Sequence, residues 1–245
     1  MSGPLVRFER DGAIVTLTLN RPEKRNALNL ALWGELEAHL AAIEAAGDAI
    51  AVVILRADGP VFCAGNDLKE RGAKLPGRFY QAKLVTRLAD LPQAVIVTVQ
   101  GGCFTGGLEL ALAGDIIVAT TSASFADTHA KFALVPAWGM SQRLPRRVGQ
   151  WKAREMSLTG LPVTGIEAVR IGLANHCVPD EELDAKVREL AESIAAQSRH
   201  SVFAYKRLYR EAADLPLAVG LAHEVFASDG VGPDFAERVA GKFGK

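Results

Sequence analysis

The sequence has no surplus of charge of either sign. Its 245 residues include 28 Lys and Arg and 28 Asp and Glu, so the formal net charge is zero. Proteins that bind nucleic acid or anionic membranes through their overall field carry a basic excess. We therefore expect no nucleic-acid partner and no membrane partner. The chain is 49% apolar and long enough to form one large core.

Cysteines are few and long apolar runs are missing. Cys63, Cys103 and Cys177 are odd in number and far apart, unlike zinc sites or disulfide frameworks. The start of the chain, MSGPLVRFERDG, has no long apolar stretch, and the apolar run at 94–99 is far shorter than a membrane span. We therefore expect no metal, no signal peptide and a location in the reducing cytoplasm.

Phosphate-binding glycine motifs are absent in their usual spacing. Gly101, Gly102, Gly106 and Gly107 give GGxxxGG, whereas a dinucleotide-binding turn needs GxGxxG. Asp127 stands at the offset of a ribose-binding acid, but this offset carries little weight without the glycine pattern. No GxxxxGK[ST] loop occurs either. We therefore reject a nucleotide-binding fold.

Strand-like segments that alternate with helix-like segments indicate an α/β fold. In AIVTLTLN at 13–20, apolar and polar residues alternate as in a half-buried strand, and an Asp-Gly turn precedes it. Leu32, Leu36, Leu40 and Ile43 have the spacing of one helix face. The expected strands lie at 6–9, 13–20, 50–55, 94–99 and 116–119, and the expected helices at 29–46, 78–88 and 108–113.

The chain after residue 185 differs in character. Helical patterns follow one another there without a convincing strand. This segment is too small for a large core of its own, so we expect it to pack on other parts of the protein or on other subunits. We divide the chain into a core with the active site, 1–185, and a helical region, 186–245. The expected helices lie at 183–197, 202–213, 217–227 and 234–243.

Two glycine-containing turns that follow buried strands form the candidate site. The first is FCAGNDLKE at 62–70, and the second is QGGCFTGGLELALAGD at 100–115. Glycine lets the backbone approach a ligand closely, and a strand-to-helix turn leaves N–H groups free to donate. If the turns converge, they make an oxyanion-binding site. The alternative is that both are only tight turns.

These two turns resemble the signature pair of the enoyl-CoA hydratase/isomerase (crotonase) family. Other blocks on both sides of these turns are also similar to family blocks and stand in the family's order over essentially the whole chain. They are LNRPEKRNAL, LVPAWGMSQRLPRRVG, LTG, AVRIGLANHCV and the tail FAERVAGKF. The resemblance implies a crotonase-like spiral of ββα units with a C-terminal helical oligomerisation region, assembled as a homotrimer or homohexamer. It also implies an acyl-CoA thioester substrate and no permanently bound cofactor, because coenzyme A arrives as part of the substrate.

The resemblance assigns an oxyanion hole to two backbone N–H groups, those of Asn66 and Gly106. An enolate carries its charge on the thioester oxygen, where one well-aimed donor is worth about 3 kcal/mol. The same comparison assigns a surface that contacts coenzyme A, with two cations near its phosphates. That surface comprises Lys24, Arg25, Ala27, Ala64, Asp67 and Leu68.

Glu109 matches the family's first catalytic glutamate, the base that activates water and then returns a proton. The alternative is that it only complements the dipole at a helix start. His129 stands where two-glutamate hydratases have their second glutamate. Imidazole can donate or accept a proton near neutral pH, so His129 is either a second catalytic group or a packing residue. The neighbouring Asp127 is a second, weaker candidate for a polar role in the site.

These residues predict an enoyl-CoA hydratase. A second interpretation keeps the stabilised enolate but changes the reaction to that of an isomerase, a hydratase-lyase or a decarboxylase. A third is a non-catalytic acyl-CoA-binding protein, which the loss of the second glutamate favours and the presence of Glu109 opposes. A fold alone does not separate these alternatives.

Overall fold

A six-stranded sheet in the order β1-β2-β3-β4-β6-β9 lies at the centre of the protein. The computed structural model describes residues 3–70, 72 and 74–243. β1 runs antiparallel to β2, and the other neighbouring strands in this sheet are parallel. In chain order these strands are β1 Val6–Asp11, β2 Ile14–Leu19, β3 Val52–Ala57, β4 Ala94–Val99, β6 Ile116–Thr120 and β9 His176–Val178.

β1 and β2 form the hairpin that the sequence predicts. Val6 pairs with Leu19 and Asp11 with Ile14. Gly12 makes the turn between them with a φ of 58°, a backbone conformation that glycine adopts without strain. β2 then pairs in parallel with β3, so the hairpin forms one edge of the sheet that the later strands extend.

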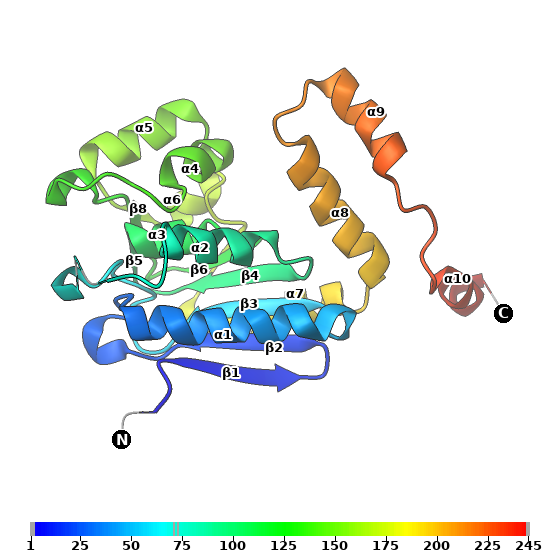
Figure 1. Cartoon of the computed structure of the whole chain (residues 1–245), viewed down its shortest axis with the longest axis horizontal. Helices are drawn as coiled ribbons and strands as arrows, with labels where there is room; N and C mark the ends of the chain where they lie inside the picture. The colour runs from blue at the N-terminus through cyan, green and yellow to red at the C-terminus, as the bar shows by residue number, and fades with distance from the viewer. Residues whose placement is uncertain (1–2, 71, 73, 244–245) are drawn as a thin grey trace.

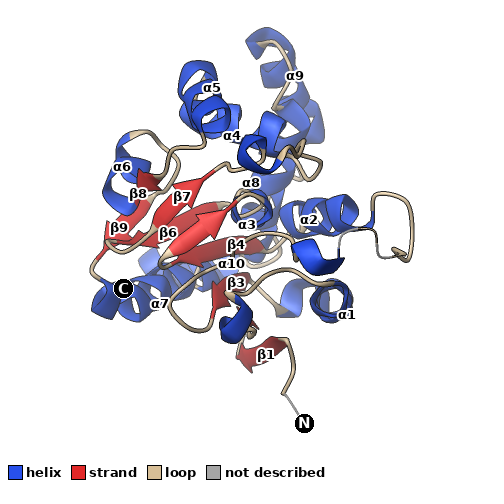
Figure 2. Ribbon diagram, turned by 90° about the vertical axis from the view of Figure 1, so that its left-hand side faces the viewer, coloured by secondary structure: helices blue, strands red, loops and turns tan. Residues whose placement is uncertain are grey.

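A second, three-stranded sheet has the strand order β5-β7-β8. β4 is followed by β5 (Gly102–Phe104) and β6 by β7 (Ser124–Ala126), and β5 pairs in parallel with β7. β8 (Val163–Thr164) joins them by pairing antiparallel with β7. The chain thus advances through both sheets together as a spiral (Figure 2). The predicted α/β class is confirmed.

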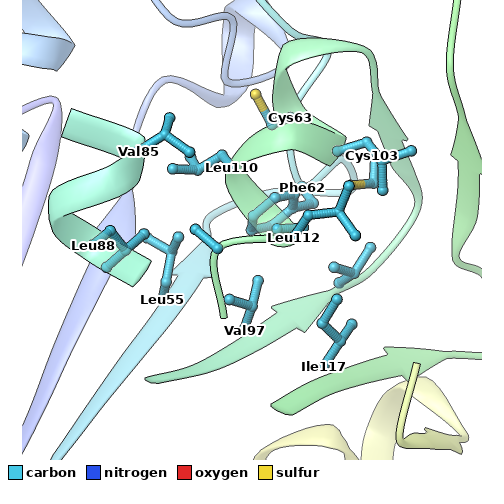
Figure 3. Packing of buried hydrophobic residues seen from close by; sticks show 14 of the residues in the cluster. Leu55, Phe62, Cys63, Val85, Leu88, Val97, Cys103, Leu110, Leu112 and Ile117 are labelled. Carbon is cyan, nitrogen blue, oxygen red and sulfur yellow. The ribbon is translucent and has the colours of Figure 1, made fainter. Parts of the chain in front are cut away.

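Helices enclose the larger core on one side of the main sheet. They are α1 Leu30–Ala46, α2 Tyr80–Asp90 and α3 Gly106–Ala111. Leu55, Val97 and Ile117 from three strands pack there with Leu88 of α2 and Leu110 of α3 (Figure 3). The alternate strand residues belong to a second cluster, which places them on the opposite face of the sheet.

That opposite face is covered by α7 (Leu183–Ala195). Val52, Ile96 and Val118 of the sheet pack there with Val187 of the helix. The boundary predicted between residues 185 and 186 therefore falls inside a helix that packs on the sheet. The change to a more exposed helical region comes after α7.

Three further helices complete the core, and the sequence patterns predict none of them. They are α4 Met140–Val148, α5 Gln150–Thr159 and α6 Gly165–Arg170. Pro145 lies inside α4, and glycines adjoin both of its ends. Such residues usually interrupt helical patterns, which hides this helix in the sequence. α4 matters for function because its first turn stands beside α3.

The last three helices extend away from the two sheets (Figure 1). They are α8 Arg199–Ala212, α9 Leu217–Ala227 and α10 Phe235–Phe243. α8 and α9, both described throughout, contain no buried residue, and Phe226 of α9 is 90% exposed. In the described part of the chain, no helix has the length and apolar character needed to cross a membrane.

Candidate active site

The two glycine-containing turns meet, as the sequence predicts. The N–H of Cys63 donates to the carbonyl of Gly102 at 3.0 Å, and the N–H of Phe104 donates to the carbonyl of Cys63 at 3.0 Å. Gly107 lies so close to Cys63 that any side chain there would collide with its carbonyl. Glycine is therefore required at 107 because the two backbones touch.

Two N–H groups at this junction are free to bind a ligand. Among the residues described, the N–H groups of Asn66 and Gly106 donate no hydrogen bond to a protein atom. Thr105, at φ 53°, reverses the chain just before Gly106, and Gly65, at φ 100°, does so before Asn66. Both free groups border one cavity of about 210 Å³.

Six of the residues predicted from the sequence line this cavity together. They come from segments up to 65 positions apart, from residue 64 to residue 129. The six are Ala64, Asn66, Leu68, Gly106, Glu109 and His129. The structure thus brings the proposed oxyanion donors, both proposed proton-transfer groups and part of the coenzyme A surface to one place.

Glu109 is buried at the start of α3 and is oriented by backbone. Its Oε1 accepts hydrogen bonds from the N–H groups of Trp138 at 2.8 Å and Met140 at 3.1 Å. Its Oε2 lies 3.6 Å from Nε2 of His129. Burial raises the pKa of the Glu109 carboxyl, although the two N–H groups oppose the rise. Oε2, which accepts neither of these N–H groups, is the oxygen of this carboxylate that lies toward the imidazole.

His129 lies between two carboxylates. Its Nδ1 is 2.6 Å from Oδ1 of Asp127, and the same oxygen accepts the backbone N–H of His129 at 3.2 Å. Burial opposes ionisation of Asp127, but hydrogen bonds from His129 and Ser157 outweigh it and hold the pKa of this carboxyl below its ordinary value. The Asp127-x-His129 spacing is visible in the sequence, whereas the contact with Glu109 is not.

Trp138 forms a wall of the cavity. Its indole ring lies against Gly106, where a methyl group in place of hydrogen would overlap it. Behind it, Trp33 of α1 packs edge-on, with ring centroids 5.2 Å apart and planes at 82°. This pair of rings limits the space beside the predicted oxyanion donors.

Lys24, Arg25 and Ala27 lie outside the cavity on an adjoining segment. The N–H of Ala64 donates to the carbonyl of Arg25 at 3.0 Å, which holds this segment beside the first turn. Both cationic side chains are exposed, and in the described ranges neither forms an ion pair. Asp67 is likewise outside the cavity lining.

Asp67 connects this segment to the first turn. Its carboxylate lies 2.7 Å from Nη1 of Arg21. The hydrogen bond from that guanidinium is the main cause of a lowered pKa for the Asp67 carboxyl. Arg21 also donates to the carbonyl of Ala27 at 3.0 Å. The structure thus gives Asp67 a clear part in holding the loop.

A larger hollow of about 800 Å³ lies between α8 and the core. Its cations already have protein partners: Arg146 pairs with Asp214 at 2.8 Å, and Lys206 pairs with Asp115 at 2.7 Å. It is also separate from the cavity that contains Glu109. The smaller cavity is therefore the candidate active site.

Comparison with known proteins agrees with this architecture. The chain resembles a crystal structure of an enoyl-CoA hydratase from Bacillus anthracis, with a TM-score of 0.91, 33% identity and coverage of 98% of this chain and 97% of that one. It also resembles a putative enoyl-CoA hydratase from Thermobifida fusca in complex with acetoacetyl-CoA, with a TM-score of 0.81, 28% identity and coverage of 91% and 93%. The crotonase-like fold is thereby confirmed.

The sequence comparisons identify the family. The model of the enoyl-CoA hydratase/isomerase family matches residues 9–228. A probable peroxisomal enoyl-CoA hydratase of Arabidopsis thaliana is 35% identical over 227 residues, which are 91% of this chain and 85% of that protein. The chain belongs to the enoyl-CoA hydratase/isomerase family.

Proposed function

We propose that this protein is an enoyl-CoA hydratase, which adds water across the 2,3 double bond of an enoyl-CoA thioester. One observation carries the proposal: buried Glu109 and the free N–H groups of Asn66 and Gly106 border the same cavity. Hydration needs a base for the water and a site for negative charge on the thioester oxygen. The relatives named above as enoyl-CoA hydratases support the same reaction.

The N–H groups of Asn66 and Gly106 act as the oxyanion hole. When water attacks Cβ, the electrons of the double bond move to the thioester oxygen and an enolate forms. The two donors are held by the hydrogen bonds between their turns, so they need no reorganisation as charge develops. Each is worth about 3 kcal/mol in a dry site. The side chain of Asn66 plays no part in this role.

Glu109 is the general base and His129 is the second proton-transfer group. Oε1 of Glu109 is held by two N–H groups, so Oε2 takes the proton from water. His129 lines the same cavity and lies 3.6 Å from that oxygen. It occupies the place of the family's second glutamate and delivers a proton to Cα.

Coenzyme A binds as part of the substrate, and no cofactor is held permanently. Ala64 and Leu68 border the cavity where the pantetheine arm would pass. Lys24 and Arg25 are exposed on the adjoining segment and supply positive charge for the phosphates. Ala27 and Asp67 flank this path chiefly through their backbone. The solved relative in complex with acetoacetyl-CoA supports a coenzyme A thioester as the ligand.

We also propose that the protein assembles as a homotrimer or homohexamer and works in the cytoplasm. The exposed apolar side chains of α9, such as Leu217, Val225 and Phe226, need a cover that the described chain does not provide. Light scattering should give a mass of three or six chains, and a monomer would contradict the assembly. The free thiols of Cys63 and Cys103, on paired segments, fit a reducing compartment.

Turnover of a panel of enoyl-CoA thioesters, with mass spectrometry of the products, tests the reaction. A hydratase converts them into products heavier by one water. Tight binding without turnover would instead identify a non-catalytic acyl-CoA-binding protein. A product of unchanged mass would identify an isomerase, and loss of carbon dioxide from a carboxylated thioester would identify a decarboxylase.

The replacement of the second glutamate by His129 is the observation that favours another family reaction. The oxyanion hole and Glu109 serve any reaction that passes through an enolate. Which of the family's reactions takes place therefore depends on which proton the imidazole of His129 transfers. The product panel separates these cases without reference to the fold.

A further inference from the structure

We infer that Asp127 is a positioning residue for the reaction: it fixes the ring of His129 so that Nε2 exchanges protons with Glu109 and the substrate. This inference rests on the proposed function for its chemistry. Its structural part concerns the proton position on the ring and stands on contacts within the chain. No step of the proposed hydration requires Asp127 to touch the substrate.

Asp127 holds both the backbone and the ring of His129. Oδ1 accepts the N–H of residue 129 at 3.2 Å and contacts Nδ1 of the ring at 2.6 Å. An ionised carboxylate can only accept hydrogen bonds, so Nδ1 must carry a proton. Any second proton on the ring therefore sits at Nε2. This nitrogen is the one that lies 3.6 Å from Oε2 of Glu109.

The charges around the ring favour that arrangement. Asp127 faces one ring nitrogen and Glu109 faces the other, and both carboxylates are buried. Within residues 3–70, 72 and 74–243, no lysine or arginine forms an ion pair with either carboxylate. Each ring nitrogen thus faces one buried carboxylate, and Asp127 is the acceptor for the proton at Nδ1.

The resulting proton path is balanced. Oε2 of Glu109 removes a proton from water while the water oxygen bonds to Cβ, and the π electrons move to the thioester oxygen. Nε2–H of His129 then gives its proton to Cα as the carbonyl re-forms. Glu109 is now protonated and His129 is neutral. Transfer of one proton from Oε2 to Nε2 restores the starting state, with one water added to the substrate.

Asp127→Asn is the direct test, because it keeps the size of the side chain and removes its charge. With a short enoyl-CoA as substrate, kcat should fall at least about 10-fold and KM should change little. A wild-type kcat in a folded variant would overturn the inference.

A matched control and a double variant separate positioning from general damage. Asp180 accepts a backbone N–H, from Ser122 at 3.3 Å, outside the cavity. Asp180→Asn should leave kcat unchanged. If Asp127 acts through His129, the double variant D127N/H129Q should be no slower than H129Q alone. An additive loss would contradict that route.

Nitrogen-15 NMR of histidine-labelled protein tests the ring directly. The signals of His129 are those that vanish in His129→Gln. In the wild type we expect a proton fixed on Nδ1, and in Asp127→Asn we expect that preference to be lost. If the wild type hydrates no enoyl-CoA, the proposed function fails while this measurement still decides the positioning. A proton on Nε2 alone in the wild type would overturn it.

Discussion

The active cavity has two walls of different construction. The backbone wall consists of the N–H groups of Asn66 and Gly106, which hydrogen bonds between two turns hold in place. The side-chain wall consists of Glu109 and His129, and Asp127, outside the cavity lining, contacts the other ring nitrogen of His129. In the proposed reaction the first supplies fixed donors for developing charge, and the second supplies groups that transfer protons.

This difference predicts opposite responses to mutation. A backbone donor survives changes to its own side chain and fails only when the chain is displaced. A proton-transfer group fails when a single atom is exchanged, even if its shape is kept. Substitutions that preserve shape should therefore disable the side-chain wall, whereas substitutions that add volume should disable the backbone wall.

Glu109→Gln should produce the largest effect. Glutamine keeps the size of the side chain and can still accept the N–H groups of Trp138 and Met140, but it cannot act as a base. We expect turnover to fall at least about 100-fold, with little change in affinity for a coenzyme A thioester measured by calorimetry. Undiminished hydration would remove Glu109 from the mechanism.

The control for this variant is Glu35→Gln. Glu35 also accepts a backbone N–H, from Val6 at 2.8 Å, but lies outside the cavity. Its turnover should match the wild type.

The pH profile offers a second check on Glu109. Because burial raises the pKa of this base, activity should be lost on acidification at a higher pH than an exposed glutamate would give.

Gly106→Ala should cause the next largest loss. The added methyl group would overlap the indole of Trp138, so either the ring or the donor must move. We expect kcat/KM to fall about 10-fold or more, a smaller loss than removal of a whole oxyanion donor would cause. The double variant G106A/W138A removes the overlap and should recover part of this loss. Equal losses in the single and double variants would show that the ring is not the obstacle.

Trp138→Ala should change substrate preference. Removing the indole enlarges the cavity of about 210 Å³ beside the oxyanion donors. Longer enoyl-CoA substrates should gain about 10-fold in kcat/KM relative to short ones, the scale of one or two methylene contacts. Trp151 of α5 is exposed, and Trp151→Ala serves as the control. An unchanged chain-length profile would show that acyl groups do not reach this wall.

Asn66→Ala should have the smallest effect. The proposed donor is the backbone N–H, and the substitution leaves it in place. We expect kcat/KM to stay within about 3-fold of the wild type, as is usual for substitutions away from reacting atoms. Stopped-flow or steady-state kinetics of the hydration of a short enoyl-CoA gives this kcat/KM. A loss as large as that of Gly106→Ala would mean that the amide side chain takes part.

Local patterns predicted most of the fold. The helix expected at 29–46 is α1, capped by the side chain of Asn29, and the strand expected at 94–99 is β4. Both have strong periodicity or clear end signals. The helix around Pro145 is short and contains a proline, which normally argues against a helix and so conceals it in the sequence. The position of α7 on the sheet depends on tertiary packing, which periodicity does not specify.

The site was predictable as a set of residues but not as an arrangement. The two turns, Glu109 and His129 are recognisable in the sequence because family motifs mark them. The backbone donors to Glu109 belong to Trp138 and to Met140, the first residue of α4, which are 29 and 31 positions away, and no local pattern marks them. Long-range contacts of this kind follow from the packing of α3 against α4.

Hydration in ¹⁸O-labelled water is the most direct measurement of the central claim, that Glu109 activates water for addition to an enoyl-CoA. The substrate is a short enoyl-CoA, and mass spectrometry follows the label. The wild type should yield a 3-hydroxyacyl-CoA with one ¹⁸O atom on C3, and Glu109→Gln should form it at least about 100-fold more slowly. An unlabelled product of unchanged mass, or equal rates in both proteins, would contradict the account.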